Sequence, residues 1–295
     1  MTYTPHIDLD AVSAIDMHVH VEQDRHGHLS LDGELMDASA AYFRAVENRT
    51  PTVADLAQTY REAGMAAVVF TVDARTNTGH PPLSSEEIAV EIAAEHADVL
   101  IPFGSVDPLR GAEAVRQARR LVTQYGVRGF KFHPTLQGFE PNDPTYHPLW
   151  ATLEELSVPA LFHTGQNGIG AGLPGGRGLK LRYSNPLLLD DVAADFPGMT
   201  VILAHPSVPW QDEALSMVTH KANVFIDLSG WSPKYFPKEL VRAATGRLRH
   251  KMLFGSDYPL LTPERWIDEF RNLAADEGVL PGVLKDNAAQ ILGLR

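Results

Sequence analysis

The stretch Ala14-Ile15-Asp16-Met17-His18-Val19-His20 is an apolar run that carries two histidines two positions apart. Alternate side chains of a β-strand share a face, so the stretch predicts a strand with His18 and His20 on one face and Asp16 behind them. Neutral imidazole nitrogens are suitable ligands for zinc and related divalent ions. The pair is therefore half of a candidate metal site, and further ligands are expected at the ends of other strands.

Short apolar runs recur along the rest of the chain and are separated by segments with the features of helices. Strands are expected at 14–20, 65–72, 99–106, 127–133, 158–164, 200–205, 223–229 and 251–258. Helices are expected at 52–63, from 84, and at 111–125, 147–156, 185–196, 208–220, 237–245, 263–275 and 281–292. Apolar strands that alternate with helices predict a parallel sheet covered by helices.

The number of these units favours a closed barrel over an open sheet. Eight strand–helix units in 295 residues predict a single-domain α/β fold over residues 1–295, the (β/α)₈ or TIM barrel. The alternative is a doubly wound open sheet, although no G-x-G-x-x-G motif follows the first strand, where a dinucleotide-binding fold would have it.

Residues 21–50 are polar and too long for a simple strand–helix connection. We interpret them as an insertion after strand 1, with some helix around Ala38–Glu47. A solvated surface excursion is the plainest interpretation. A substrate lid, or an arm that packs on a second copy in a homodimer, are the alternatives.

Composition excludes several classes of function. The net charge of −12 argues against nucleic acid or an anionic membrane as the main partner. The chain has no cysteine, which excludes disulfides, thiolate nucleophiles and thiolate metal ligands. The first residues show no basic segment followed by an apolar run, and no apolar stretch approaches the length of a membrane span. A cytoplasmic location is therefore expected.

Ionisable residues stand at the ends of five of the predicted strands, where they would be costly to bury without a purpose. In a (β/α)₈ barrel the chemistry lies at the carboxyl ends of the strands, which the fold brings together. The residues at these ends are His18 and His20, Lys131 and His133, His163, His205, and Asp257.

Each of these residues also has a structural interpretation. His163 is either a hydrogen-bonded core histidine or a metal ligand, and the pair on the first strand favours the ligand. His205 is either a ligand or a general acid/base, and the second role is favoured. Asp257 lies in a turn before Pro259, where aspartate is common for structural reasons, yet its carboxylate could bind a metal and accept a proton.

Two residues on the fourth strand keep several possible roles. Lys131 could balance the charge of Asp257, contact a substrate carboxylate, or carry a carbamate that bridges two metal ions. His133 lies two residues further on the same face and could contact the substrate or only the rim of the site.

The loops after the fifth and seventh strands indicate an anionic, aromatic substrate. No acidic residue occurs between Leu156 and Leu189, whereas Arg177, Lys180 and Arg182 do, which predicts a local positive patch suited to a carboxylate or phosphate. Decoration of a flexible glycine-rich loop is the alternative. Trp231, Tyr235 and Phe236 could form the wall of an aromatic pocket, or could pack against neighbouring loops.

These motifs together resemble the amidohydrolase superfamily, in its amidohydrolase-related branch of metal-dependent hydrolases and non-oxidative decarboxylases. The motifs are H-x-H at 18–20, K-x-H-P at 131–134, F-H-T-G at 162–165, A-H-P at 204–206 and G-S-D-Y-P at 255–259. The resemblance implies that His18, His20, His163 and Asp257 hold one divalent metal ion, with His205 as a catalytic residue beside it. Zinc is the first expectation and manganese the second.

The same resemblance implies a less favoured variant, in which a carboxylated Lys131 bridges a second metal ion. The loops after the fifth and seventh strands also resemble a subgroup that we associate with cleavage of aromatic β-ketoacyl thioesters.

The leading functional hypothesis is a hydrolase of a small anionic, aromatic acyl compound, attacked at its carbonyl by metal-activated water. Asp257 or His205 would accept the proton of that water. A non-oxidative decarboxylase of an aromatic or unsaturated carboxylic acid would use the same residues. A barrel that binds a metal or ligand without catalysis is the third hypothesis. Lys131, His133, Arg177, Trp231 and Tyr235 are the expected substrate contacts.

Overall fold

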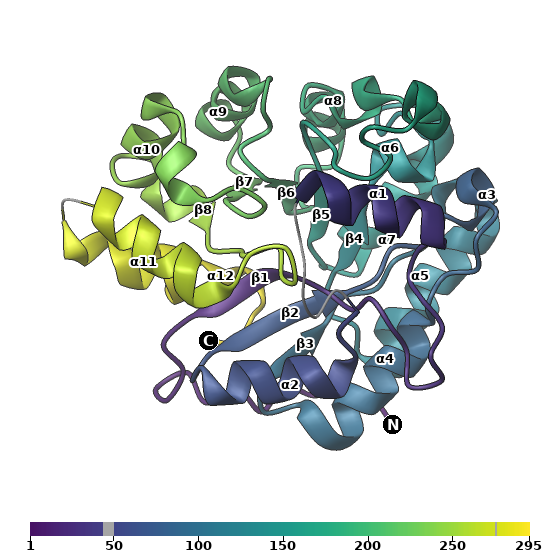
Figure 1. Ribbon diagram of the computed structural model, residues 1–295, viewed down its shortest axis with the longest axis horizontal. Helices are drawn as coiled ribbons and strands as arrows, with labels where there is room; N and C mark the ends of the chain where they lie inside the picture. Colours follow the sequence, from purple (N-terminus) through teal and green to yellow (C-terminus); the bar gives the residue numbers. More distant parts are fainter. Residues whose placement is uncertain (44–49, 275) are drawn as a thin grey trace.

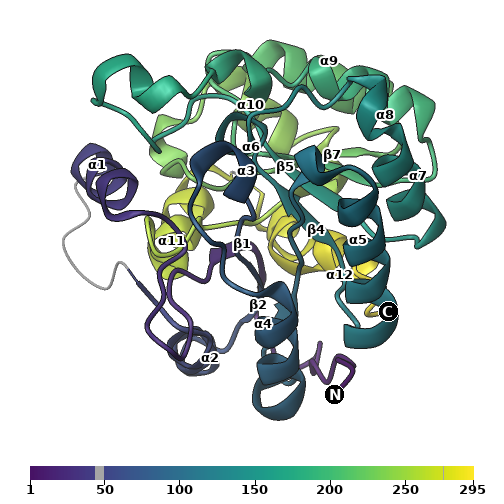
Figure 2. The ribbon, with the colours of Figure 1, turned by 90° about the vertical axis from the view of Figure 1, so that its right-hand side faces the viewer.

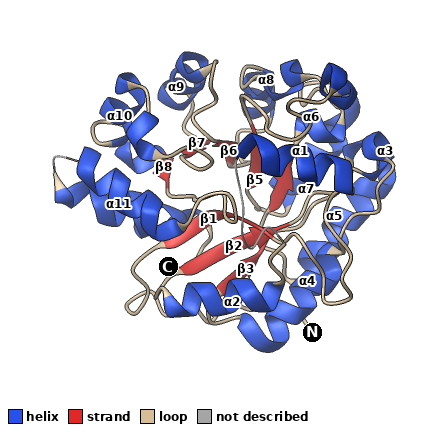
Figure 3. Ribbon diagram, viewed as in Figure 1, coloured by secondary structure: helices blue, strands red, loops and turns tan. Residues whose placement is uncertain are grey.

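The computed structural model describes residues 1–43, 50–274 and 276–295. Its strands form two parallel sheets (Figures 1 and 3). The first sheet has the order β1 (Ile15–His20), β2 (Ala66–Phe70) and β3 (Leu100–Pro102). The second has the order β4 (Phe130–Phe132), β5 (Ala160–His163), β6 (Val201–Ala204), β7 (Val224–Asp227) and β8 (Met252–Leu253).

The two sheets join at both seams to close a barrel. A parallel bridge between Gly104 and Phe130 joins β3 to β4, and a second between Val19 and Tyr258 joins β1 to the residues after β8. The backbone amide of Met17 also donates to the carbonyl oxygen of Phe254 at 2.9 Å. The predicted (β/α)₈ barrel is therefore confirmed, and the open-sheet alternative is wrong.

Helices surround the barrel, as the view turned by 90° shows (Figure 2). Their bounds are α2 (Val53–Glu62), α3 (Arg75–Thr78), α4 (Ser85–Glu91), α5 (Ala112–Tyr125), α6 (Pro134–Gln137), α7 (His147–Glu155), α8 (Leu188–Asp195), α9 (Gln211–His220), α10 (Lys238–Ala244), α11 (Pro263–Leu273) and α12 (Asn287–Ile291), with α1 (Gly33–Phe43) in the insertion. No helix of the described residues is long and apolar enough to cross a membrane.

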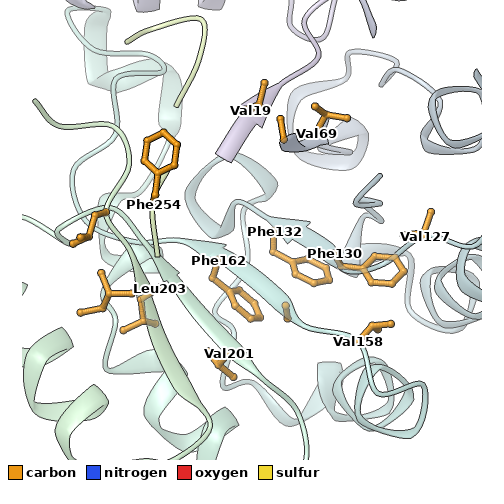
Figure 4. Close-up of a cluster of buried hydrophobic side chains, with 14 of the residues drawn as sticks. Val19, Val69, Val127, Phe130, Phe132, Val158, Phe162, Val201, Leu203 and Phe254 are labelled. Atoms are coloured by element: carbon orange, nitrogen blue, oxygen red, sulfur yellow. The ribbon is translucent and has the colours of Figure 1, made fainter. Parts of the chain in front are cut away.

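The apolar strands bury side chains on both of their faces. One cluster of buried residues lies between the strands and the helices and includes Val69, Phe132, Phe162 and Leu203 (Figure 4). A second cluster fills the barrel with the alternate residues of the same strands, namely Ile15, Met17, Ala66, Val68, Phe70, Ile101, Leu161, Ile202 and Leu253. Burial on both faces explains why the strands read as continuous apolar runs in the sequence.

The first strand departs from regular alternation. Its register against β2 shifts between Asp16 and Val19, so that β1 has one residue more than its neighbour across this interval. An extra residue turns the following side chains to the other face. Asp16 consequently faces α2, where it accepts a hydrogen bond from the Tyr60 hydroxyl at 2.6 Å, while His18 faces the barrel mouth. Asp16 lies behind the two histidines in the strand, with its side chain turned to the opposite face.

Asp16 joins three elements at the base of the site. One carboxylate oxygen accepts the backbone amides of His18 and Ser256, each at 3.0 Å. The other accepts the hydroxyls of Tyr60 and Ser256, at 2.6 and 2.5 Å. These bonds tie β1 and α2 to the segment that ends at Asp257, and so fix two candidate ligands relative to each other.

The insertion after β1 packs on the same chain at the barrel mouth. The side-chain amide of Gln166, in the glycine-rich loop after β5, donates to the Tyr42 hydroxyl of α1 at 2.6 Å. Arg177 of that loop pairs with Asp32 at 2.8 Å and with Glu34 at 2.9 Å. Helix is confirmed from Ala38 to Phe43, and positions 44–47 of the predicted helix lie outside the described residues.

Candidate metal centre and active site

The carboxyl ends of the strands bring three candidate metal ligands together. One ligand atom each of His18, His20 and Asp257 lies within 4.8 Å of the other two. Oδ1 of Asp257 is 3.2 Å from Nε2 of His18 and 3.1 Å from Nε2 of His20. The histidines end β1 and the aspartate follows β8, so the seam between the first and last strands forms this group.

A buried carboxylate on β7 orients His18. Nδ1 of His18 lies 2.5 Å from Oδ2 of Asp227, and the Ser229 hydroxyl donates to the same carboxylate oxygen at 2.9 Å. Burial lowers the pKa of His18 well below its ordinary value and raises that of Asp227, so the two residues share one proton. A cation beside Nε2 favours that proton on Nδ1, which leaves a lone pair on Nε2. Carboxylate–histidine pairs of this kind orient the ligands of metal sites.

Asp257 remains a carboxylate although it is buried. Burial alone would raise its pKa, but the hydrogen bond to His20 and the neighbouring His205 and Lys131 lower the pKa below its ordinary value. Its backbone φ is +67°, an uncommon conformation for a residue with a side chain. Such strain costs about 1–3 kcal/mol and is typical of functional sites.

His163 and His205 form a hydrogen-bonded pair beside this group. Nδ1 of His205 donates to the Ser229 carbonyl oxygen at 3.1 Å, which makes its Nε2 an acceptor. Nδ1 of His163 lies 3.0 Å from that acceptor and therefore carries a hydrogen. Nε2 of His163 is left with a lone pair, and it is buried without a hydrogen-bond partner among the described residues. This tautomer suits a metal ligand.

Burial keeps both members of this pair neutral. It lowers the pKa of His163 well below its ordinary value and that of His205 to about 4. His163 also stacks on the ring of His133 at 3.8 Å between centroids. His163 lies outside the group of three ligand atoms that meet within 4.8 Å, so its role as the fourth ligand stays a prediction.

Lys131 lies against the metal-ligand candidates. Its Nζ donates to Nε2 of His18 at 2.9 Å and lies 4.9 Å from the centre of the Phe70 ring. Burial lowers the pKa of Lys131 to about 8, although Asp257 and Asp227 act in the opposite direction. The ammonium group of Lys131 therefore faces the lone pair on Nε2 of His18.

The residues present fit a divalent metal ion. Nε2 of His18 and Oδ1 of Asp257 lie 3.2 Å apart and both offer lone pairs, so a cation between them would interact with both, in addition to the Lys131 ammonium that already contacts Nε2. Two imidazoles, a carboxylate, and the unpaired Nε2 of His163 make a nitrogen- and oxygen-donor set of the kind that zinc or manganese takes.

A cavity of about 460 Å³ opens above these residues. The candidate ligands, His205, Lys131 and His133 line it, and so do Trp231 and Tyr235 from the loop after β7. Tyr42 and Phe43 of α1 line it as well, so the insertion contributes to the cavity wall as a substrate lid would. Phe236 instead packs against Trp266 in the core, at 6.3 Å between ring centroids.

The structure places Arg177 outside the described lining of the cavity. Its guanidinium is paired with Asp32 and Glu34 of the insertion. The other two cations of the predicted positive patch also have partners: Arg182 pairs with Glu140 at 3.0 Å, and Nζ of Lys180 lies 5.7 Å from the centre of the Tyr183 ring. The prediction of a positive patch considered only the charges within the loop. Asp32, Glu34 and Glu140 lie outside the loop in sequence and pair with its arginines.

The sequence analysis missed three charged residues of the site. Asp227 ends an apolar strand in the same way as the predicted residues, so its position was a usable signal. Glu22 lines the cavity, with a carboxylate oxygen 3.8 Å from Nδ1 of His20, and Arg265 lines it from α11. Glu22 lies two residues beyond His20, at the end of β1, so its position was also a usable signal, whereas Arg265 follows no strand-end pattern.

Gly230 occupies a position where a side chain would disturb the site. Its φ is +73°, and an added Cβ would lie 2.5 Å from Nδ1 of His205 and 3.0 Å from Oδ2 of Asp257. Gly230→Ala is therefore expected to displace His205 and to lower kcat about 100-fold, as small misplacements of catalytic groups do.

Gly79→Ala is the matched control for this variant. Gly79 has a φ of +75° with nothing within 4 Å of an added Cβ, so both variants incur the left-handed strain of about 1–2 kcal/mol. Thermal unfolding should report destabilisation of both, larger in Gly230→Ala because of its close contacts, with activity lost only in Gly230→Ala. Equal activity of the two variants would contradict the assigned position of His205.

Known proteins resemble the chain in sequence and in fold. The profile of the family described as Amidohydrolase matches residues 15–294. Among solved structures, an uncharacterized TIM-barrel protein from Bordetella bronchiseptica is 20% identical, with a TM-score of 0.75 over 95% of this chain and 98% of that one. A dihydroxybenzoic acid decarboxylase from a Polaromonas species, with bound manganese and the inhibitor 2-nitroresorcinol, is 16% identical, with a TM-score of 0.69 over 96% and 97% of the two chains.

A third solved structure is a probable 2-pyrone-4,6-dicarboxylic acid hydrolase from Acinetobacter baumannii with citric acid bound. It is 17% identical, with a TM-score of 0.62 over 96% of this chain and all (100%) of that one. No curated protein matches the sequence. At these identities the structural likeness shows the fold alone.

Proposed function

Because the chain belongs to the amidohydrolase family, whose members are metal-dependent enzymes, we propose that it is a metal-dependent hydrolase of a small anionic, aromatic acyl compound. The observation that carries the proposal is the convergence of His18, His20 and Asp257 on one point of the cavity, with the His163–His205 pair beside them. An aromatic β-ketoacyl thioester is the specific substrate class that we propose.

The ligand set would hold one divalent ion, zinc or manganese, through His18, His20, Asp257 and His163. When bound, such an ion lowers the pKa of water and polarises a carbonyl group. Binding at this group would also fix the acyl carbonyl at the base of the cavity, below the aromatic wall of Trp231 and Tyr235.

Asp257 and His205 are the residues able to accept a proton from the attacking water. The lowered pKa of Asp257 keeps it ionised near neutral pH, and the lowered pKa of His205 keeps that imidazole neutral, so each has a lone pair that can take a proton. The residue that takes the proton would return it to the leaving group. Lys131 and His133, on and just after β4, both line the cavity and would contact the oxygens of the substrate.

A non-oxidative decarboxylase is the second candidate. A dihydroxybenzoic acid decarboxylase solved with manganese has the same fold as this chain, and so does a probable 2-pyrone-4,6-dicarboxylic acid hydrolase, so the fold accommodates either reaction. In this reaction the same proton donor would protonate the carbon that loses carbon dioxide. The donor set is the same in both schemes, so only the product separates them.

The test is a product assay with the metal-loaded protein. A panel of aryl esters, aromatic acyl thioesters and aromatic carboxylic acids would be scored for released acid and for released carbon dioxide. Release of acid from an ester or thioester, without carbon dioxide, is the expected result. Stoichiometric carbon dioxide from a carboxylic acid would instead establish the decarboxylase. No product from any compound of the panel would leave only a binding role, and product formation that persists in His205→Ala and Asp257→Asn would contradict the roles assigned to these two residues.

A further inference from the structure

Arg265 is a cation on the cavity that the proposed chemistry does not use. It belongs to the first turn of α11 and lines the cavity near Tyr235 and Leu261. Its side chain is 53% exposed, whereas Lys131 at the base of the cavity is buried. Arg265 therefore lies toward the solvent side of the cavity, and the candidate metal ligands lie at its base.

Glu269 holds the guanidinium of Arg265 in place. Nε of Arg265 donates to Oε1 of Glu269 at 3.0 Å, and the Ser232 hydroxyl donates to Oε2. Lys234 lies 4.0 Å from the same carboxylate. Burial would raise the pKa of Glu269, but the bonds from Ser232 and Arg265 lower the pKa below its ordinary value. Glu269 is thus a charged anchor shared by two cations, which leaves a net positive charge.

The anchoring leaves one edge of the guanidinium available. Among the described residues, Arg265 donates a hydrogen bond only through Nε, so its two terminal nitrogens keep their hydrogens for another acceptor. These nitrogens form a planar fork that matches the two oxygens of a carboxylate or the oxygens of a phosphate. The cavity beside the guanidinium distinguishes this ion pair from a typical surface ion pair on a helix.

Apolar and aromatic side chains make up much of the remaining lining of the cavity. They include Phe43, Ile169, Trp231, Tyr235 and Leu261. The cavity therefore combines a metal-ligand group at its base, an apolar and aromatic lining, and a fixed cation toward solvent. A ligand with the complementary pattern has two polar ends and an apolar or aromatic spacer.

We propose that Arg265, oriented by Glu269 and supported by the charge of Lys234, binds a second anionic group of a bifunctional acyl substrate whose reacting carbonyl lies at the metal centre. The inference rests on the proposed function and specifies it further. It assigns the recognition of the anion to α11, in place of the loop that carries Arg177, and it makes Arg265 a specificity-determining residue.

Calorimetric titration of the metal-loaded protein tests the proposal. The probes are straight-chain dicarboxylates from glutarate to sebacate and the monocarboxylates of equal length. At the chain length that spans the cavity, the dicarboxylate should bind about tenfold more tightly than its monocarboxylate. Arg265→Gln should remove this preference and leave monocarboxylate affinity unchanged. A parallel series of ω-phosphonocarboxylates tells whether phosphate fits better than carboxylate, and a gain in either series that depends on Arg265 supports the proposal.

Arg271→Gln is the matched control, because Arg271 lies on the same helix in an ion pair with Asp268 and is not part of the described lining. It should keep the preference of the unmodified protein. An equal preference in Arg265→Gln, or none at any length in the unmodified protein, would overturn the inference. If the inference is overturned in either way, monocarboxylate binding that is lost in His18→Ala would still support the metal centre on which the proposed function rests. If no probe binds in a metal-dependent way, both proposals fail.

Discussion

Asp257→Asn and His205→Ala are each expected to lower kcat by about 10³-fold on any substrate that the product panel identifies. Asparagine keeps the shape of the Asp257 side chain but removes the charge that would bind the cation and accept a proton. Alanine at position 205 removes the imidazole that is hydrogen-bonded to His163 at 3.0 Å. Steady-state kinetics at saturating substrate provide the measurement.

Two exposed residues provide the controls for these variants. Asp268→Asn and His147→Ala change the same residue types on α11 and α7, where the side chains are 74% and 37% exposed. Their kcat should stay within about twofold of the unmodified protein, as expected for surface positions away from the site. Unchanged kcat in either site variant, with an unaltered melting temperature, would contradict the assignment of the acid–base residues.

Removal of the metal is expected to abolish activity. Dialysis against a chelator should reduce turnover to the background rate, and added zinc or manganese should restore it, because the imidazole and carboxylate ligands alone cannot polarise the carbonyl. His18→Ala and His20→Ala should lower the metal content from about one ion per chain to near zero, since each removes one nitrogen ligand. Elemental analysis after gel filtration measures the content.

Asp227→Asn tests the orientation of His18 in the same assay. The amide keeps the size of the side chain but loses the charge that holds the proton on Nδ1, so metal affinity should fall about 10- to 100-fold. His147→Ala should bind metal normally. Full metal content in His18→Ala, or full activity of the chelated protein, would contradict a catalytic role for the ion.

The barrel could be predicted because its strands are buried on both faces. Burial of both faces produces uniformly apolar runs such as 158–164 and 200–205, in which a single histidine is conspicuous. In a closed parallel barrel, the carboxyl ends of all strands meet at one rim. Residues far apart in sequence, such as His18 and Asp257, could therefore be assigned to one site before any contact was known.

The features that escaped the sequence analysis depend on contacts between distant segments. The bulge in β1 places Asp16 against Tyr60. The alternation of side chains along a regular strand, which the sequence analysis used, cannot reveal such an extra residue. Arg177 is neutralised by Asp32 and Glu34, which lie in the insertion far from the loop in sequence. Arg265 lies in the first turn of a helix, and only the path of the chain after β8 brings it to the cavity.

The central claim is that His18, His20, His163 and Asp257 share one metal ion at the mouth of the barrel. The most direct measurement is the anomalous scattering of crystals of the protein loaded with manganese or zinc. The account predicts a single strong anomalous peak within bonding distance, about 2.0–2.2 Å, of Nε2 of both β1 histidines and of an Asp257 oxygen, with His163 as the fourth ligand. A peak located elsewhere, or none in a crystal of fully loaded protein, would contradict it.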